Sequence, residues 1–188
     1  ARGTLRKVLM AMERLTCLCA NKVIPEGVGV KKALEADHIT RKPLKIVLNG
    51  NINGIDTAFF APKGTRAERR TALNLVEADF VFIFIGRIVA DKGMNELATC
   101  MRRLESTHPH CKLILVGNFE TDLDPLSDDN EQFFKTAPNI RFVGFQNDVR
   151  PYLEAADALV FPSYREGFPN VVMQAGAMSL PAIVTDIN

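Results

Sequence analysis

The chain has 188 residues, of which 47% are hydrophobic and spread throughout, so it has enough apolar surface for one or two folded domains and is not a disordered chain. Its net charge of +1 at pH 7 is uneven: residues 1–50 hold ten Lys or Arg and four Asp or Glu, the rest 13 and 18. A basic front end suits an anionic membrane surface, but no aromatic stacking platform accompanies it, so nucleic acid is not an expected partner.

Residues 2–15 are predicted to form an amphipathic helix, because apolar residues recur there at helical spacing with basic residues on the other side. This helix either faces the protein core or lies on a membrane surface. A second helix is predicted over residues 28–36 and a strand over residues 43–50. The segment 49–64 contains Asn-Gly pairs that favour tight turns, and it is interpreted as an interdomain hinge.

From Ala67 onward, apolar strands alternate with helical stretches. The predicted strands are residues 79–86, 112–117, 139–145, 157–163 and 180–186. The helical stretches between them are residues 93–106, 130–137, 149–156 and 170–179. Continuous apolar runs indicate strands buried on both faces, and this order of elements predicts an α/β fold with a Rossmann-like, doubly wound parallel sheet. Ligands of such sheets bind outside the carboxyl ends of the strands.

The first of these strands runs into a loop that reads GRIVADKG. The loop places Arg87 and Lys92 five residues apart, before a helix whose start is marked by Gly93. Two cations beside a helix N-terminus suit a diphosphate, because fixed positive charge and free backbone N–H groups favour anions. The alternative is a solvated loop that carries two basic residues without a ligand.

The third strand runs into the stretch GFQNDVRP. Gly144 allows a backbone to approach a ligand closely, and Phe145 is able to cover a flat base. Asp148 is suited to cap the helix that follows, which is the alternative role for this segment.

The fourth strand ends in PSYREGFPN, where Gly167 frees the backbone. Pro169 or Asn170 is expected to start a helix whose N–H groups point back into the ligand crevice. Glu166 would then lie at the mouth of this crevice. Its two acceptor oxygens suit paired sugar hydroxyls, whereas a carboxylate repels a phosphate. The alternative is a salt bridge to Arg165 or to a neighbouring loop.

Other residues that could bind a metal or act as a catalytic base are weaker candidates. Asp122 and Asp124 have the DxD spacing that some sugar-transfer enzymes use for a metal, but their loop is crowded with Asp and Ser, so a solvated loop is favoured. The histidines His38, His108 and His110 have no paired carboxylate, and none is proposed as a catalytic base. The chain lacks GxGxxG after a strand and GxxxxGK[ST], which argues against a dinucleotide dehydrogenase and a P-loop enzyme.

The four cysteines form no CxxC pair and have no histidine at zinc-ligand spacing. We expect reduced thiols in a cytoplasmic protein, with Cys17 and Cys19 packed on one face of a strand. The chain begins without Met and has no signal-peptide layout, and its longest apolar run is too short to span a bilayer. Both termini are expected to be cuts within a longer protein.

Taken together, these motifs resemble the retaining glycosyltransferases of family 4, also called glycosyltransferase group 1, which have the glycosyltransferase B (GT-B) fold. The resemblance is carried by GRIVADKG, LILVG, NGID and the run FVGFQNDVRPYLEAADALVFPSYREGFPNVVMQAGAMSLPAIVTD. It covers nearly the whole chain and is similar in character to bacterial capsule, exopolysaccharide and O-antigen enzymes. It implies two Rossmann-like domains facing a cleft. Residues 1–56 would be the tail of the N-terminal acceptor domain, 57–66 the linker, and 67–188 the nucleotide-sugar-binding domain, truncated at its C-terminus.

The resemblance also implies roles for individual residues. Arg87 and Lys92 would bind the donor diphosphate and stabilise the leaving nucleotide, and Glu166 would hold hydroxyls of the donor sugar, so these three are the expected catalytic residues. The implied donor-binding positions are Gly86, Val143, Gly144, Phe145, Gly167, Phe168, Pro169, Asn170, Val171 and Gln174. Gln174 departs from the family's Glu-x7-Glu pattern, in which the second acid binds ribose hydroxyls. An amide has one acceptor oxygen and no charge, so weaker binding of ribose is expected.

The reaction implied by the resemblance is retaining transfer of a hexosyl group from a nucleoside diphosphate sugar, expected to be a UDP-sugar, to an acceptor hydroxyl. No cofactor or metal is expected. The acceptor would be a saccharide or a polyprenyl-linked saccharide at the inner face of the membrane, where the basic front end would make peripheral contact. The fragment alone is not expected to be active. Two alternatives are a nucleotide-sugar-binding protein without transferase activity and a sugar-nucleotide epimerase of similar architecture.

Overall fold

The computed structural model describes residues 3–48, 50–51, 53–122 and 124–187. The chain forms two compact units. The first unit extends up to Gly54 and includes the short segment Glu166–Pro169. The second unit contains Ile55–Arg165 and Asn170–Ile187. The boundaries predicted from the sequence at residues 56 and 66 stay predictions.

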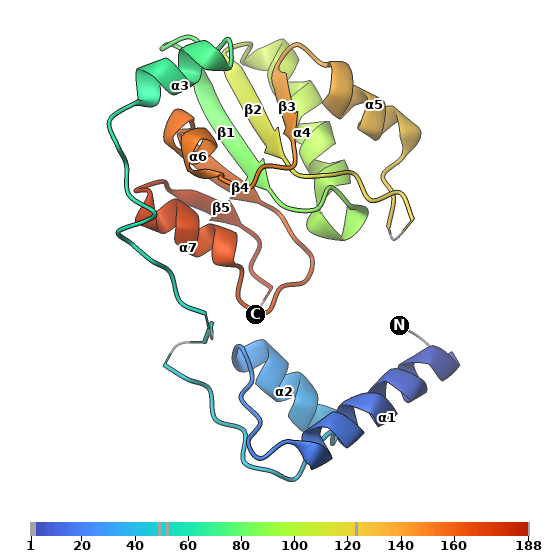
Figure 1. Cartoon of the computed structure of the whole chain (residues 1–188). Coiled ribbons are helices and arrows are strands. Elements are labelled where there is room, and N and C mark those ends of the chain that lie inside the picture. The colour runs from blue at the N-terminus through green and yellow to red at the C-terminus, as the bar shows by residue number, and fades with distance from the viewer. Residues whose placement is uncertain (1–2, 49, 52, 123, 188) are drawn as a thin grey trace. The chain divides into compact units, whose positions relative to one another are not determined.

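The first unit contains two helices, α1 (Gly3–Cys19) and α2 (Val28–Ala36) (Figure 1). α2 coincides with the helix predicted there. α1 continues one turn beyond its predicted end, so the placement of Cys17 and Cys19 on a strand is wrong. The two alternating thiols resembled a strand pattern, but the helical periodicity of the preceding residues continues through them. Residues two apart on a helix point in different directions, and Cys17 is buried while Cys19 is exposed.

The strand predicted over residues 43–50 is also wrong for the part of it that the structure describes. Val23 and Leu44 form an isolated parallel bridge, without the continued ladder of hydrogen bonds that makes a strand. The sequence shows an apolar pattern but does not show whether a partner strand is present. Asn49 and Ile52 of the predicted hinge lie outside the described residues.

The apolar stripe of α1 is exposed on this chain. Its exposed side chains include those of Leu5, Val8, Leu9, Met12 and Leu15. Burial in a core and contact with a membrane both stay predictions for this stripe. Over the ranges that the structure describes, no helix has the length and apolar character needed to cross a bilayer.

The second unit is built on a parallel sheet of five strands. They are β1 (Phe80–Ile85), β2 (Cys111–Val116), β3 (Ile140–Gly144), β4 (Ala158–Phe161) and β5 (Ala182–Val184). The order across the sheet is β3-β2-β1-β4-β5, and every adjacent pair is parallel. The predicted fold class and all five predicted strands are therefore confirmed.

Four helices connect these strands: α4 (Met94–Thr107), α5 (Asp128–Thr136), α6 (Arg150–Ala155) and α7 (Asn170–Ala177). All four were predicted. α4 and α5 cover one face of the sheet, and α6 and α7 cover the other (Figure 1). This arrangement follows from right-handed crossovers, because the chain reverses direction across the sheet after β3.

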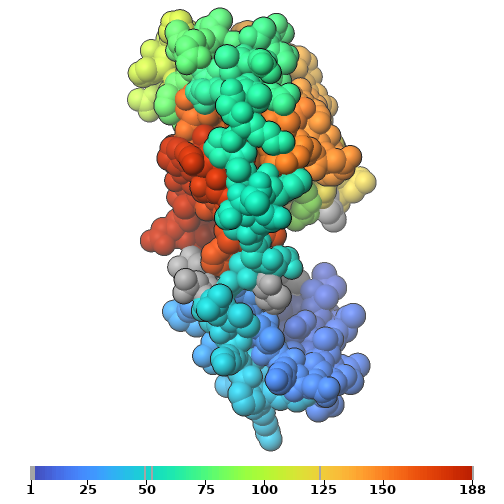
Figure 2. Space-filling view, turned by 60° about the vertical axis from the view of Figure 1, so that its left-hand side comes forward, coloured from blue at the N-terminus to red at the C-terminus, as the bar shows by residue number. Residues whose placement is uncertain are grey.

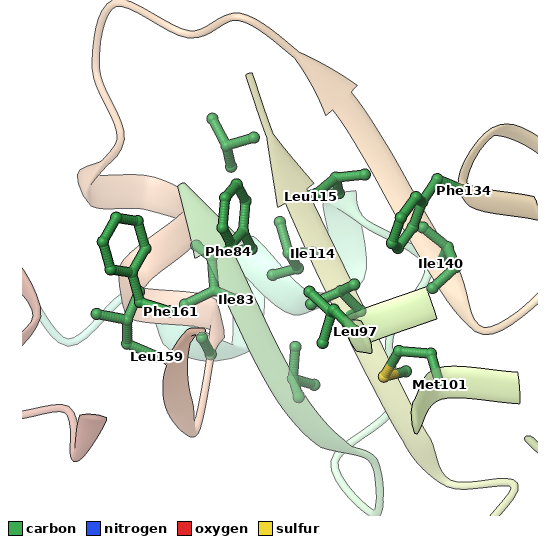
Figure 3. Close-up of a cluster of buried hydrophobic side chains, with 14 of the residues drawn as sticks. Ile83, Phe84, Leu97, Met101, Ile114, Leu115, Phe134, Ile140, Leu159 and Phe161 are labelled. Carbon is green, nitrogen blue, oxygen red and sulfur yellow. The ribbon is translucent and has the colours of Figure 1, made fainter. Parts of the chain in front are cut away.

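The core lies between the sheet and these helices. Phe84 of β1 and Phe161 of β4 stack with ring centroids 5.6 Å apart, and Leu97 and Met101 bring α4 against the sheet (Figure 3). Ile114 of β2 is fully buried among them. The central strands β1, β2 and β4 are largely buried, as their apolar sequences predicted. The same prediction is wrong for β5, whose three residues are exposed, and holds only in part for β3, because these two strands lie at the edges of the sheet.

A short charged helix, α3 (Arg66–Ala72), precedes the sheet and was not predicted. It lacks the apolar periodicity of a surface helix, and its place is set by Arg70, whose side chain is 2% exposed. The Arg70 guanidinium forms an ion pair of 2.6 Å with Asp157 at the start of β4. A tertiary contact of this kind is not visible in local sequence.

The segment before α3 lies on the surface of the second unit, beside α6 (Figure 2). The carboxylate of Glu154 accepts hydrogen bonds of 2.9 Å from the backbone N–H groups of Lys63 and Thr65. The Arg150 guanidinium lies 3.7 Å from the ring centroid of Phe59. Residues 59–65, within the predicted linker, are therefore anchored to α6.

Candidate functional site

The sheet has one topological switch point, between β1 and β4. The chain leaves β1 toward β2 and β3, then returns across the sheet to form β4. The loops after β1 and β4 therefore diverge at the carboxyl edge, which is where open α/β sheets keep a ligand crevice. The predicted site residues Arg87 and Lys92 follow β1, and Glu166 follows β4.

Glycines let the loops at this edge approach one another. Gly93 is the N-cap of α4 and has φ of 70°, and a Cβ added there would lie 2.1 Å from the carbonyl oxygen of Pro162 after β4. A Cβ added at Gly117 would lie 1.8 Å from the carbonyl oxygen of Gly86. A side chain at either position would overlap backbone atoms, so the loops after β1, β2 and β4 pack backbone to backbone.

A pocket of about 400 Å³ opens at the ends of β1, β2 and β3. It is lined by Ile85, Gly86, Arg87, Val116, Gly117, Asn118, Glu120, Phe145, Gln146 and Val149. It brings together three of the predicted site residues, Gly86, Arg87 and Phe145. Asn118, Glu120 and Gln146 were not predicted. Their one signal in the sequence is that they lie a few residues beyond strand ends.

The turn after β3 has the open backbone and the exposed aromatic ring that were expected from the sequence. Gly144 has φ of 68°, and a Cβ added there would meet open space within 4 Å. The Phe145 side chain is 65% exposed. The amide of Gln146 donates a hydrogen bond of 2.7 Å to the carbonyl oxygen of Val143, which shapes this turn. An exposed ring beside an open backbone is suited to cover a flat ligand.

The two predicted cations lie in different surroundings. Arg87 lines the pocket, is half exposed, and pairs with Glu120 at 3.2 Å. Lys92 ends a short 3₁₀ helix, η1 (Ala90–Lys92), and its ammonium lies 5.5 Å from the ring centroid of Phe161 at the end of β4. Arg87 is therefore part of the pocket lining, whereas Lys92 lies near the end of β4.

Asp148 makes capping contacts ahead of α6. Its carboxylate accepts a hydrogen bond of 3.1 Å from the backbone N–H of Arg150 and pairs with the Arg150 guanidinium at 2.6 Å. The guanidinium holds the pKa of Asp148 below its usual value. The N-cap position of α6 is Val149, whose side chain makes no capping hydrogen bond, so Asp148 lies one residue before the position predicted for it.

The loop after β4 is attached to η1. The Arg165 guanidinium pairs with the Asp91 carboxylate at 2.8 Å. A salt bridge of Glu166 to Arg165 or to a neighbouring loop stays a prediction. The pairing with Arg165 is also the main reason that the pKa of Asp91 is lowered, with Lys92 and Arg87 adding to the effect.

The remaining predicted positions follow Arg165 along the chain. Glu166, Gly167, Phe168 and Pro169 form the end of the loop, and α7 begins at Asn170, one of the two expected starts. Val171 is buried in the core, so only its backbone is available to a ligand. Gln174 lies in the second turn of α7 and is partly exposed.

Asp124 of the DxD pair has a structural role. Its carboxylate accepts a hydrogen bond of 2.6 Å from the backbone N–H of Asp91, at the start of η1. Leu123 lies outside the described residues. In the part of the chain that the structure describes, no cluster of His, Cys, Asp and Glu has an arrangement able to hold a metal ion.

Comparison with known proteins gives a family and relatives. Residues 79–188 match the sequence profile of the family described as glycosyl transferases group 1. The chain is 29% identical over 181 residues to the capsular polysaccharide biosynthesis glycosyltransferase CapM of Staphylococcus aureus, covering 96% of this chain and 47% of that protein. It is 29% identical over 143 residues to UDP-Gal:alpha-D-GlcNAc-diphosphoundecaprenol alpha-1,3-galactosyltransferase of Escherichia coli, covering 72% and 36%. The chain thus spans about half or less of the length of these relatives.

Solved structures show the same fold. The crystal structure of Anabaena Alr3699/HepE in complex with UDP and glucose matches with a TM-score of 0.77 at 20% identity, over 97% of this chain and 49% of that chain. At this identity the likeness concerns the fold alone. The structural neighbours are GT-B glycosyltransferases, as the sequence motifs predicted.

Proposed function

Because the chain belongs to the glycosyl transferases group 1 family, we propose that it is the nucleotide-sugar-binding part of a retaining glycosyltransferase. The enzyme would move a hexosyl group from a UDP-sugar to an acceptor hydroxyl during synthesis of a cell-surface polysaccharide. The observation that carries this proposal is the pocket at the carboxyl edge, whose lining includes Arg87 and the exposed Phe145, the residue that follows the open backbone at Gly144.

Arg87 and Lys92 are proposed to bind the diphosphate. A guanidinium offers five N–H donors in a planar fork that matches phosphate oxygens, and an ammonium supplies a compact second charge. Negative charge builds up on the leaving nucleotide as the glycosidic bond breaks, and fixed cations stabilise that charge without reorganisation. Arg87 lines the pocket together with its partner Glu120, which lies 3.2 Å away. A diphosphate would compete with this carboxylate.

The nucleoside is proposed to lie in the same pocket. Its volume of about 400 Å³ falls in the range of small-ligand sites, and the Phe145 ring and the backbone from Val143 to Gly144 would border the base. Gln174 would bind ribose with one acceptor oxygen. Uridine is preferred as the nucleoside because the names of the Escherichia coli relative and the Anabaena structure contain UDP.

The donor sugar is proposed to be held by Glu166, whose carboxylate accepts from two hydroxyls at once. Gly167, Phe168 and Pro169 follow in the loop, and α7 begins at Asn170 with the positive end of its dipole, which favours an anion.

The acceptor is proposed to be a saccharide or a polyprenyl-linked saccharide. Support comes from the Escherichia coli relative, whose name specifies a diphosphoundecaprenol substrate. The excess of basic residues over residues 1–50 suits peripheral contact with the inner face of a membrane from the cytoplasm. Because the chain spans about half the length of its relatives, transfer itself would need the rest of the protein.

The proposal is tested by calorimetric titration of this chain with UDP, GDP and ADP, in the presence of a chelator. One-to-one binding is expected, with UDP preferred. Glu166→Ala is expected to leave the affinity for UDP nearly unchanged and to lower the affinity for an intact UDP-sugar by at least about tenfold, because each hydrogen bond to a charged group contributes about 1.5–3 kcal/mol. Glu131→Ala on α5, which removes a carboxylate paired with Lys135, is the matched control. Failure of all three nucleotides to bind the folded chain would contradict the proposal.

A further inference from the structure

Asp91 connects three loops at the carboxyl edge of the sheet. Its backbone N–H donates to the Asp124 carboxylate after β2 at 2.6 Å. Its carbonyl oxygen accepts from the backbone N–H of Tyr164 after β4 at 3.0 Å. The hydroxyl of the buried Ser163 lies 3.4 Å from the same carbonyl oxygen and 3.1 Å from the carbonyl oxygen of Arg165, and it can donate to either one. A single residue of the loop after β1 is thus bonded to the loops after β2 and β4.

The side chain of Asp91 adds a two-point contact to this network. Arg165 donates through Nε and Nη2 to the two carboxylate oxygens, at distances from 2.8 to 3.2 Å. A fork of this kind fixes the orientation of both partners, whereas a single charge contact does not. Tyr164, the residue before Arg165, donates its hydroxyl to Glu96 on α4 at 2.7 Å, which attaches the same loop at a second point.

The chain neighbours of this pair are residues with proposed roles in donor binding. Lys92 follows Asp91 directly, and Glu166 follows Arg165 directly. We propose that Asp91 and Arg165 are positioning residues that couple the loop carrying Lys92 to the loop carrying Glu166. The inference rests on the proposed function for the roles of Lys92 and Glu166.

The Asp91–Arg165 pair is expected to affect the positions of the two loops more than the stability of the fold. Arg165 is 77% exposed, and exposed ion pairs contribute little to the stability of a fold. The position of a binding group, however, matters steeply, since a displacement of about 1 Å can lower a rate by about two orders of magnitude. A pair that adds little stability can therefore still determine the positions of Lys92 and Glu166 relative to a bound donor.

The test has to separate geometry from charge. Asp91 lies in the field of Arg165, Lys92 and Arg87, so neutralising any one of these groups would change the attraction for an anion by itself. Arg165→Lys keeps the charge and removes the fork. Asp91→Glu likewise keeps the charge and moves the carboxylate by one methylene. Arg102→Lys is the matched control, because Arg102 on α4 makes a comparable pair with Asp129 on α5 at 2.6 Å.

The first readout needs no ligand. Hydrogen exchange of the Tyr164 amide, which bonds to the Asp91 carbonyl, is expected to become faster in Arg165→Lys and Asp91→Glu and to stay unchanged in Arg102→Lys. The second readout is the affinity for UDP and for a UDP-sugar. Arg165→Lys is expected to lower the affinity for the UDP-sugar about tenfold and that for UDP by less, with an unchanged unfolding midpoint.

Unchanged exchange at Tyr164 would overturn the coupling. Faster exchange with unaltered affinity for the UDP-sugar would leave the pair with a structural role only, and would overturn its positioning role. Absence of nucleotide binding by the unmodified chain would instead count against the proposed function, while the exchange measurement would still decide whether the two loops are coupled.

Discussion

Replacing Arg87 with alanine is expected to weaken the binding of UDP to this chain about 10- to 100-fold, since hydrogen bonds to charged groups contribute about 1.5–3 kcal/mol. Arg87 lines the pocket at the carboxyl edge and pairs with Glu120 at 3.2 Å, so its guanidinium is already oriented there. The replacement would also leave the Glu120 carboxylate in the pocket without this partner, and that charge repels a diphosphate. Isothermal titration calorimetry measures the effect.

Two further variants separate the effect of paired guanidinium hydrogen bonds from the effect of positive charge. Arg87→Lys keeps the charge and is expected to bind UDP with intermediate affinity, because an ammonium cannot make paired bonds to phosphate. Lys112→Ala removes one positive charge near the amino end of β2, and it is expected to change affinity little because salt screens distant charges. If Arg87→Ala binds UDP as tightly as Lys112→Ala, Arg87 does not contact the diphosphate.

Replacing Arg70 with alanine is expected to lower the free energy of unfolding of the second unit by about 3–5 kcal/mol, as in other broken buried ion pairs. The guanidinium is 2% exposed and pairs with Asp157 at 2.6 Å. It also donates to the carbonyl oxygens of Val76, Glu77, Asp79 and Ala155. Alanine would remove this donor from all four carbonyls, two of which, those of Asp79 and Ala155, are buried.

Arg66→Ala is the matched control for this prediction. Arg66 lies on the same helix and pairs with the same carboxylate, but its side chain is 36% exposed, so a loss of about 1 kcal/mol is expected. Urea unfolding followed by tyrosine fluorescence measures both, because the chain's two tyrosines, Tyr152 and Tyr164, belong to the second unit. Equal destabilisation by the two variants would contradict the account.

The sheet was predictable because each strand is rich in apolar residues and each connection has a helical pattern. Such local patterns largely determine the order of elements and the edge at which a ligand binds. Arg87 and Phe145 could be placed in one pocket for the same reason, since they follow strands that end at one edge.

Residues whose role depends on tertiary partners could not be predicted. The role of Glu120 follows only from its contact with Arg87, and that of Arg165 only from its ion pair with Asp91. α3 was missed because its position is set by the buried Arg70. Over residues 43–50 the apolar pattern suggested a strand, but pairing depends on a partner that a local pattern does not show.

The central claim is that a nucleoside diphosphate binds at the carboxyl edge of the sheet, and the most direct test is a nuclear magnetic resonance titration of the ¹⁵N-labelled chain with UDP. Glycine amides are well-separated reporters. Shifts are expected at Gly86, Gly117 and Gly144, which lie at this edge. No shift is expected at Gly64, which lies in the segment anchored to α6. Shifts at Gly64 without shifts at the other three would contradict the claim, as would an unchanged spectrum at saturating UDP.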